Sequence, residues 1–242
     1  MKTRPAIVIP AYNHGRHLSQ VLERSLTFGY PVFVVDDGST DATPGMLSSA
    51  SGVTVIRHDR NMGKGAALLS GFSAAVRVSD WALSLDADGQ HDPSDIRALV
   101  RAVPEGTRPL VIGRRSGMGH ENVPWTSRWG RGFSNFWVWV CSGSRLADSQ
   151  SGFRLYPIPE TLRLGAKARR FQFEVEILVR AAWSGIPILE VPVRAVYEPP
   201  GERVSHFRPW LDFWRNTLTF TRLFAARFFI PSRFRKRMHL RG

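Results

Sequence analysis

The chain has 242 residues, of which 43% are hydrophobic, so it is long enough for one large domain or one domain with an appendage. No stretch of about eighteen uninterrupted apolar residues occurs, so a standard membrane-spanning helix is not expected. The formal net charge is +13, with 33 Lys and Arg against 20 Asp and Glu. This excess predicts an anionic partner, such as nucleic acid, an acidic membrane or phosphate groups.

The amino terminus and the cysteine content favour a reducing compartment. The first ten residues, MKTRPAIVIP, lead directly into a strand-like run and lack the pattern of a signal peptide. Cys141 is the only cysteine in the sequence, so no disulfide can form within the chain. We therefore expect a cytoplasmic protein.

The first half of the chain alternates between strand-like and helical patterns. Apolar runs predict strands at residues 6–10, 31–39, 53–58, 81–89 and 110–115. Helical spacing and N-cap residues predict helices at residues 17–28, 41–50, 64–76 and 92–103. Alternating strands and helices indicate βαβ units, and hence an α/β fold with a mostly parallel sheet.

The second half is less regular. Residues 124–143 are rich in Trp and Arg, and residues 170–185 have a helical pattern that ends at Gly185. Residues 187–198 are typical either of a strand pair or of one bent strand. The segment from Pro209 onward has the pattern of an amphipathic helix.

Polar clusters follow several of the predicted strands. They are Pro10-Ala11-Tyr12-Asn13, Asp36-Asp37-Gly38-Ser39, Asp86-Ala87-Asp88 and Arg114-Arg115. Open parallel α/β sheets bind their ligands at the carboxyl ends of the strands. Four clusters at one edge of the sheet therefore predict a binding site there.

The pair Asp86 and Asp88 suits a hard divalent cation. Mg²⁺ prefers oxygen ligands and is commonly held by one or two carboxylates, with substrate phosphates completing its shell. We expect Mg²⁺ or Mn²⁺ at Asp86 and Asp88, with Gln90 as a further ligand. The alternative is a solvated turn in which Asp92 caps the next helix, which leaves Asp86 unexplained at the end of a buried run.

Two further motifs allow both a binding and a structural interpretation. Asp36-Asp37 is typical either of a turn before a helix or of a carboxylate that recognises a nucleotide. The run Asn61-Met62-Gly63-Lys64-Gly65 lacks the spacing of a phosphate-binding P-loop. It forms either a glycine turn into a helix or a loop that brings Lys64 to a ligand.

Taken in order, PAYN, VDDGSTD, NMGKG, DADGQHDP, GRR, DSQSGFRLY and FQFEVEILVRA resemble the motifs of family 2 glycosyltransferases, across residues 5–200. Within that family, the chain is most similar to the dolichyl- and polyprenyl-phosphate sugar transferases. The resemblance implies a GT-A fold, a Rossmann-like mostly parallel sheet flanked by helices, with the nucleotide-sugar donor at the strand ends. It also implies an inverting, metal-dependent transfer from UDP or GDP to a membrane lipid, most simply a polyprenyl phosphate.

The resemblance assigns roles to individual residues. The expected donor-binding residues are Pro10, Tyr12, Asn13, Val35, Asp37, Lys64, Asp86, Ala87, Asp88, Arg115, Arg203 and His206. The expected acceptor residues are Arg128, Arg131, Ser134 and Ser151, and the expected catalytic residues are Asp148 and Arg115. The sequence departs from the family pattern at His14, where Glu is usual, and in the loop GERVSHF (201–207), where Arg203 and His206 take the place of other cations.

The identity of the acceptor decides what Asp148 must do. A lipid phosphate is already anionic and needs no strong base, whereas the hydroxyl of another lipid or of a pigment-type molecule must lose a proton. Asp148 is the candidate base for a hydroxyl acceptor. Its alternative role is to cap a turn and orient Arg154.

The carboxyl-terminal segment predicts a membrane contact. We expect a catalytic domain at residues 1–208, followed at 209–242 by an interfacial amphipathic helix and a basic tail. The helical stripe comprises Trp210, Trp214, Thr217, Thr221, Phe224 and Phe228, with Arg residues between. Such a helix either lies at an anionic membrane surface, here the inner face, or packs on the domain as an ordinary amphipathic helix.

A nucleic-acid-binding protein is a different reading of the +13 charge, since interleaved Arg and aromatic residues can contact phosphates and stack on bases. It leaves the Asp clusters without a role. We therefore expect no nucleic-acid partner.

Overall fold

The structure is a computed structural model that describes residues 3–116, 125–195 and 209–229. Its strands are β1 (Ala6–Ala11), β2 (Val32–Asp36), β3 (Thr54–Arg57), β4 (Trp81–Ser84), β5 (Leu110–Ser116), β6 (Arg154–Pro157) and β7 (Ile188–Arg194). Its helices are α1 (Gly15–Leu26), α2 (Thr43–Ser48), α3 (Lys64–Ala75), α4 (Ile96–Arg101), α5 (Trp125–Ser142), α6 (Ile158–Arg163), α7 (Gln172–Trp183) and α8 (Pro209–Phe229). The alternation predicted for the first half of the chain is confirmed.

The strands form one mostly parallel sheet in the order β3-β2-β1-β4-β6-β5-β7. Strand β6 is antiparallel to both of its neighbours, β4 and β5. β6 was not predicted from the sequence, because its four residues RLYP stood out only as part of a motif. The order of the strands reverses between β1 and β4, and open α/β sheets bind ligands at the carboxyl ends of the strands beside such a point.

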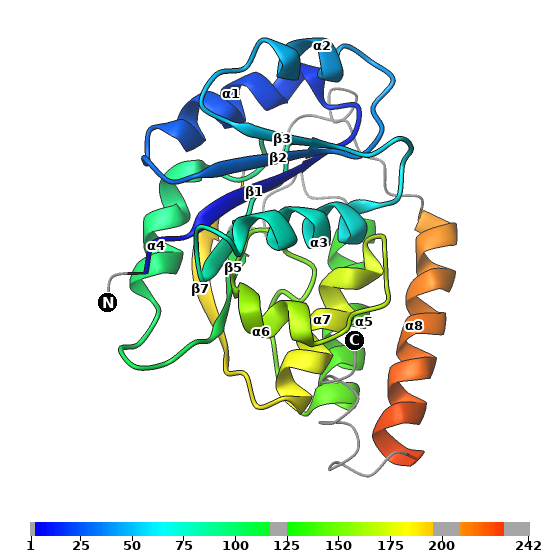
Figure 1. Cartoon of the computed structure of the whole chain (residues 1–242). Coiled ribbons are helices and arrows are strands. Elements are labelled where there is room, and N and C mark those ends of the chain that lie inside the picture. Colours follow the sequence, from blue (N-terminus) through cyan, green and yellow to red (C-terminus); the bar gives the residue numbers. More distant parts are fainter. Residues whose placement is uncertain (1–2, 117–124, 196–208, 230–242) are drawn as a thin grey trace.

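Helices cover both faces of the sheet (Figure 1). Successive side chains of a strand point to opposite faces, so Ile7 and Ile9 of β1 pack with α1, α2 and α4, while Val8 packs on the other side with α3 and α7. The helix predicted at 17–28 is present as α1, and its side chains Leu18, Val21 and Leu22 are buried against the sheet.

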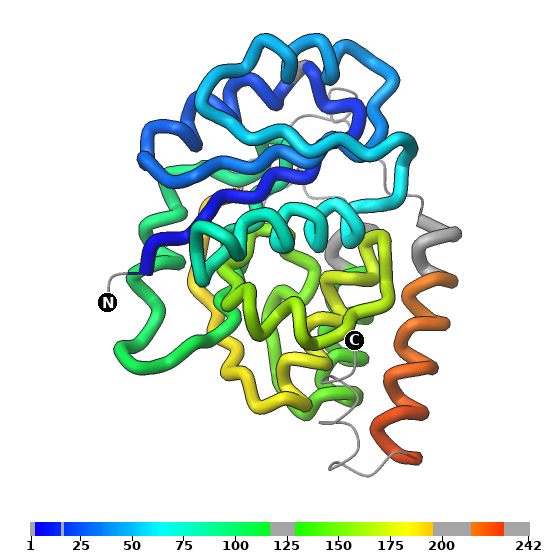
Figure 2. The backbone as a smooth tube through the Cα atoms, viewed as in Figure 1, coloured from blue at the N-terminus to red at the C-terminus, as the bar shows by residue number. Residues whose placement is uncertain are grey.

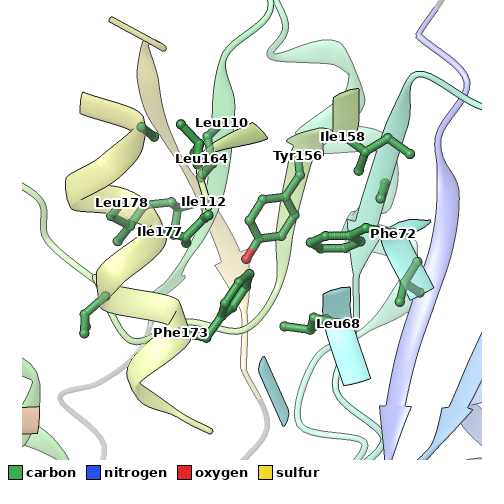
Figure 3. Close-up of a cluster of buried hydrophobic side chains, with 14 of the residues drawn as sticks. Leu68, Phe72, Leu110, Ile112, Tyr156, Ile158, Leu164, Phe173, Ile177 and Leu178 are labelled. Carbon is green, nitrogen blue, oxygen red and sulfur yellow. The ribbon is translucent and has the colours of Figure 1, made fainter. Parts of the chain in front are cut away.

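Figure 3 shows the core beneath α3 and α7, where Tyr156 of β6 lies between Phe72 of α3 and Phe173 of α7. The rings of Phe72 and Tyr156 are 4.9 Å apart. A side chain at Gly71 would collide with Val8, so α3 packs closely on β1. This packing places Lys64, the first residue of α3, at the strand ends.

Helix α8 lies along one side of the molecule beside α5 and α7 (Figures 1 and 2). Phe220 and Leu223 reach from α8 into the same core as Phe72. No helix in the described part of the chain combines the length and the apolar character needed to cross a membrane. The helix predicted from Pro209 onward is present as α8, and one of its faces packs on the domain through Phe220 and Leu223.

Several boundaries differ from the prediction. β4 ends at Ser84 instead of residue 89, because the chain turns at Gly89, whose φ is +73°, and the N–H of Gln90 bonds back to Asp88. The helix expected at 92–103 begins as a 3₁₀ turn (Pro93–Asp95), capped by Asp92, before α4. β5 extends to Ser116, so Arg114 and Arg115 lie within the strand. Of the two alternatives for residues 187–198, the single strand is present, as β7.

Candidate active site

The loops that follow β1 and β2 are hydrogen-bonded to each other at the carboxyl ends of these strands. The N–H of Asn13 donates to Ser39 Oγ at 2.9 Å, and the N–H of Thr40 donates to Asn13 Oδ1 at 2.9 Å. Asn13 has a φ of +55°, a conformation that Asn tolerates better than most residues. Asn13, expected to bind the donor, thus holds the rim together, beside half-buried Tyr12.

Asp37 organises the loop between β3 and α3. Its carboxylate accepts the N–H of Met62 at 2.9 Å and that of Gly63 at 2.7 Å, and Asp37 Oδ1 lies 2.7 Å from His58 Nδ1. His58 Nε2 lies 2.9 Å from Ser70 Oγ. Sequence reasoning missed His58, although its place directly after β3 matches that of the other rim residues. Asp36 makes the expected turn by accepting the N–H of Ser39.

Lys64 stands between two carboxylates. Its Nζ lies 2.6 Å from Asp86 Oδ1 and 2.5 Å from Glu174 Oε1. Burial alone would lower the pKa of Lys64, but the charges of Asp86 and Glu174 outweigh it and raise that pKa. Burial would likewise raise the pKa of Asp86, and the Lys64 ammonium reverses this and lowers it. The sequence assigned Glu174 no role; the signal was an acid within the apolar run of α7.

The remainder of the Asp-rich turn is buried beside Asp86. Gln90 and His91 are 8% and 5% exposed, and the His91 ring stacks on Phe153 at 5.2 Å. Burial lowers the pKa of His91 to about 4, so the ring is neutral at physiological pH. This turn therefore carries its negative charge on Asp86 and Asp88.

The donor atoms at this turn are chemically suited to a divalent cation. Carboxylate oxygens of Asp86 and Asp88 are hard ligands, and both side chains are partly exposed. Within the described residues, no group of three or more His, Cys, Asp or Glu side chains is arranged to hold a metal. Two carboxylates are sufficient when substrate phosphates supply the other ligands, so the site fits a cation that is shared with a diphosphate.

Arg115 and Asp148 form a second ion pair, in which the Asp148 side chain is completely buried and the Arg115 side chain is 13% exposed. Arg115 Nε and Nη2 each donate to one oxygen of Asp148 at 2.8 Å, and the N–H of Arg115 adds a third bond at 3.2 Å. Burial would raise the pKa of Asp148, but the hydrogen bonds and charge of Arg115 lower it. The Glu190 carboxylate accepts the N–H groups of Ala147 and Asp148. Asp148 is thus held as a carboxylate with low proton affinity.

The alternative role considered for Asp148, orienting Arg154, is not seen in the hydrogen bonds of Arg154. The Arg154 guanidinium donates to the main-chain carbonyls of Ser149, Ser151 and Glu174. Arg115 lies nearer to Asp148 because it belongs to β5, whereas Arg154 of β6 points under the loop that precedes it.

Of the remaining predicted site residues, some lie near Asp148, some are buried and some lie outside the described residues. Arg131 of α5 is close enough to contribute to the lowered pKa of Asp148. Ser134 Oγ lies 3.0 Å from Ser149 Oγ, and Ser134 and Ser151 are both buried. Pro10, Val35 and Ala87, expected to bind the donor, are buried. The Arg128 side chain, Arg203 and His206 lie outside the described residues.

Comparisons with known proteins agree with this architecture. The model described as "Glycosyl transferase family 2" matches residues 6–160. The chain is 29% identical over 213 residues to the UDP-N-acetylglucosamine–dolichyl-phosphate N-acetylglucosaminyltransferase of Methanococcus voltae, covering 79% of this chain and 85% of the relative. It is 32% identical over 216 residues to the undecaprenyl-phosphate mannosyltransferase of Micrococcus luteus, covering 82% and 86% of the two chains.

A solved structure of GalNAc-T7 with UDP, GalNAc and Mn²⁺ has a TM-score of 0.59 and 15% sequence identity, covering 98% of this chain and 54% of that one. That likeness concerns the fold, which is of the GT-A type. Because the family model spans more than half of the sequence, the chain belongs to glycosyl transferase family 2 and is a glycosyltransferase.

Proposed function

We propose that the protein transfers a sugar from a UDP- or GDP-sugar to the phosphate of a polyprenyl-type membrane lipid, with inversion at the anomeric carbon. The names of two relatives support this acceptor class, since one is a dolichyl-phosphate and the other an undecaprenyl-phosphate transferase. The same two names differ in the sugar, so they support the acceptor more strongly than the donor.

The observation that carries the proposal is the Arg115–Asp148 pair. A general base must take a proton, and a fully buried carboxylate with both oxygens bound to one guanidinium is poorly suited to do so. A lipid phosphate attacks without giving up a proton first. A hydroxyl acceptor, the alternative, would require Asp148 to leave Arg115.

The donor side supplies positive charge where the leaving group gains negative charge. Asp86 and Asp88 would hold Mg²⁺ or Mn²⁺, which when bound would neutralise the departing diphosphate. Lys64 forms an ion pair with Asp86, and we assign it to the diphosphate. Tyr12 and Asp37 are assigned to the nucleoside, where the ordered loop after β3 forms one wall.

Inversion follows from a single displacement. An oxygen of the lipid phosphate bonds to the anomeric carbon on the face opposite the diphosphate, and the bond from that carbon to the diphosphate breaks. The electron pair of the broken bond leaves with the nucleoside diphosphate. We assign Arg131 and Arg128 to the acceptor phosphate, because α5 brings Arg131 near Asp148.

A peripheral position on the anionic inner face of the membrane completes the proposal. Large side chains are exposed on α5 and α8, namely Trp129, Phe136, Trp139, Trp214, Leu218, Phe228 and Phe229. The Arg145 guanidinium lies 5.3 Å from the Trp139 ring. Aromatic and basic side chains together suit the boundary between headgroups and acyl chains.

Flotation with anionic vesicles tests the attachment. Replacing Trp214, Leu218 and Phe228 with Ser spares the inward-facing Phe220 and Leu223, so the fold should persist. We expect binding to fall at least about tenfold, since each buried methylene contributes about 0.8 kcal/mol. Unchanged flotation would exclude α8 as an anchor.

The transfer itself is tested with purified protein, polyprenyl phosphate and a panel of labelled UDP- and GDP-sugars, with and without Mn²⁺. We expect one donor to yield a sugar-phosphate-lipid whose anomeric configuration is opposite to that of the donor, by NMR. Asp88→Ala serves as the inactive control. A folded protein that transfers no sugar from either class of donor would contradict the proposal.

A further inference from the structure

Lys64 forms ion pairs with two carboxylates, Asp86 and Glu174. The ammonium contacts Asp86 at 2.6 Å and Glu174 at 2.5 Å, and its side chain is only 15% exposed. Asp86 is also the carboxylate to which we assigned the cation. A positively charged group of the chain itself is therefore already bound to that carboxylate.

We propose that Lys64 occupies the cation position on Asp86 until a nucleoside diphosphate arrives, and that Glu174 then retains Lys64 while Asp86 is used for the divalent cation. This rests on the donor site of the proposed function. Glu174 is thereby a positioning residue, since it acts through Lys64 and not on the substrate.

Glu174 is suited to retain the ammonium because it is fixed more firmly than Asp86. It lies in the first turn of α7 and is 6% exposed, whereas the Asp86 side chain is 23% exposed. Its main-chain carbonyl accepts a hydrogen bond from Arg154 Nη1 at 2.7 Å. Lys64 can consequently release the more exposed partner and keep the buried one.

Gly152 allows the three groups to meet. A Cβ at this position would come within 3.0 Å of both Asp86 oxygens and of the Lys64 ammonium. The main chain of residue 152 thus covers the ion pair without a side chain, and Lys64 and Asp86 lie directly beneath it.

The charges predict that cation and diphosphate bind cooperatively. In the absence of nucleotide, a divalent cation must compete with Lys64 for Asp86. It must also lie next to the positive charge of Lys64. A diphosphate brings negative charge that attracts both cations, so the competition is relieved. Because coupling between two ligands is reciprocal, Mn²⁺ should strengthen nucleotide binding by the same factor as the nucleotide strengthens Mn²⁺ binding.

Mn²⁺ binding measured by electron paramagnetic resonance, with and without saturating UDP or GDP, tests this directly. Without nucleotide, we expect Lys64→Met to bind Mn²⁺ about tenfold more tightly than wild type, a factor within the range typical of coupled sites. The factor by which nucleotide strengthens Mn²⁺ binding should be smaller in this variant by a similar amount. Lys64→Arg, which keeps the charge, should resemble wild type. Lys167→Met removes the same charge from an exposed side chain and should change nothing.

Glu174→Gln provides an independent measurement if Lys64→Met does not fold. Among the described residues, Lys64 then has no second carboxylate partner. The Mn²⁺ affinity in the presence of nucleotide should therefore fall about tenfold. Equal Mn²⁺ affinities for wild type and Lys64→Met, or an unaffected Glu174→Gln, would overturn the inference. A folded wild type that binds neither UDP nor GDP would instead contradict the proposed function, while Mn²⁺ binding without nucleotide would still decide the role of Lys64.

Discussion

Asp86 and Asp148 lie at the same edge of the sheet, and each is paired with a cation, yet the two pairs are built differently. Asp86 is partly exposed and shares Lys64 with Glu174. Asp148 is completely buried, and both of its oxygens are bound to Arg115. The first carboxylate can exchange partners, whereas the second cannot without leaving a buried charge unpaired. The environment, more than the residue type, determines which Asp is available for ligands.

The largest expected effect separates the two pairs by stability. Asp148→Asn should lower the free energy of unfolding by about 3–5 kcal/mol, because it leaves the Arg115 charge without its buried partner. Asp86→Asn should cost clearly less, since Lys64 keeps Glu174. Urea denaturation measures both, with exposed Asp59→Asn as a control expected within about 0.5 kcal/mol of wild type. Equal losses at the two sites would remove the distinction.

Sugar-transfer activity should depend strongly on the Asp-rich turn, where substitutions cost little stability. Asp86→Asn and Asp88→Asn should slow sugar transfer about 10²–10³-fold with little loss of fold, as is typical when a group that stabilises transition-state charge is removed. Asp92→Asn is the matched control in the same turn, because Asp92 caps the 3₁₀ turn and Asn caps equally well. Initial rates decide the matter; a comparable loss in Asp92→Asn would show that the turn as a whole, and not the pair, is responsible.

Burial also predicts a pH dependence at His91. Its pKa is about 4 in the folded protein and about 6.5 when unfolded, so below pH 6.5 the unfolded chain binds a proton that the folded chain does not. Stability should therefore fall as the pH drops from 6.5 to 4, by at most about 3 kcal/mol. Denaturation across this range should show a shallower slope for His91→Asn. Parallel slopes would mean that His91 is not buried as a neutral ring.

The smallest effect concerns α8. Arg222 Nη2 contacts Glu176 Oε1 at 2.9 Å, but Arg222 is half exposed, and Glu176 keeps Arg180 and the N–H groups of Lys167 and Ala168. Arg222→Met should cost less than about 1 kcal/mol of unfolding free energy. Arg180→Met, at the buried partner of the same carboxylate, should cost about 3–5 kcal/mol. Thermal denaturation of the two variants compares the stability lost with the exposed Arg222 and with the buried Arg180, which share Glu176.

The sequence predicted the part of the site that depends on local pattern. Parallel strands end at the same edge of a sheet, so residues at their carboxyl ends lie together. Asp37, Asp86 and Arg115 could therefore be placed at one edge from the sequence. The partners could not be placed, because they come from distant segments. Lys64 and Glu174 are 110 residues apart and meet where α7 packs against α3. Arg115 and Asp148 were each assigned to the site, but their pairing required the structure.

The four-residue strand β6 shows a second limit. Its residues RLYP form no apolar run like the ones that predicted β3 and β4, which also have four residues. Its neighbours β4 and β5 both precede it in the chain, so only the folded sheet gives it a place. β6 brings Arg154 beneath the loop at Ser149 and Ser151, and this loop carries Asp148 toward Arg115. The position of Asp148 thus depends on an element that the sequence pattern did not predict.

The most direct measurement offers the protein two acceptors of equal prenyl length in one reaction, a polyprenyl phosphate and the corresponding polyprenol, with the preferred nucleotide sugar. Mass spectrometry of the lipid products shows which of the two carries sugar. Because Asp148 is committed to Arg115, we expect sugar on the phosphate and none above background on the alcohol. Sugar on the alcohol that disappears in a folded Asp148→Asn variant would show that Asp148 acts as a base and would contradict the account.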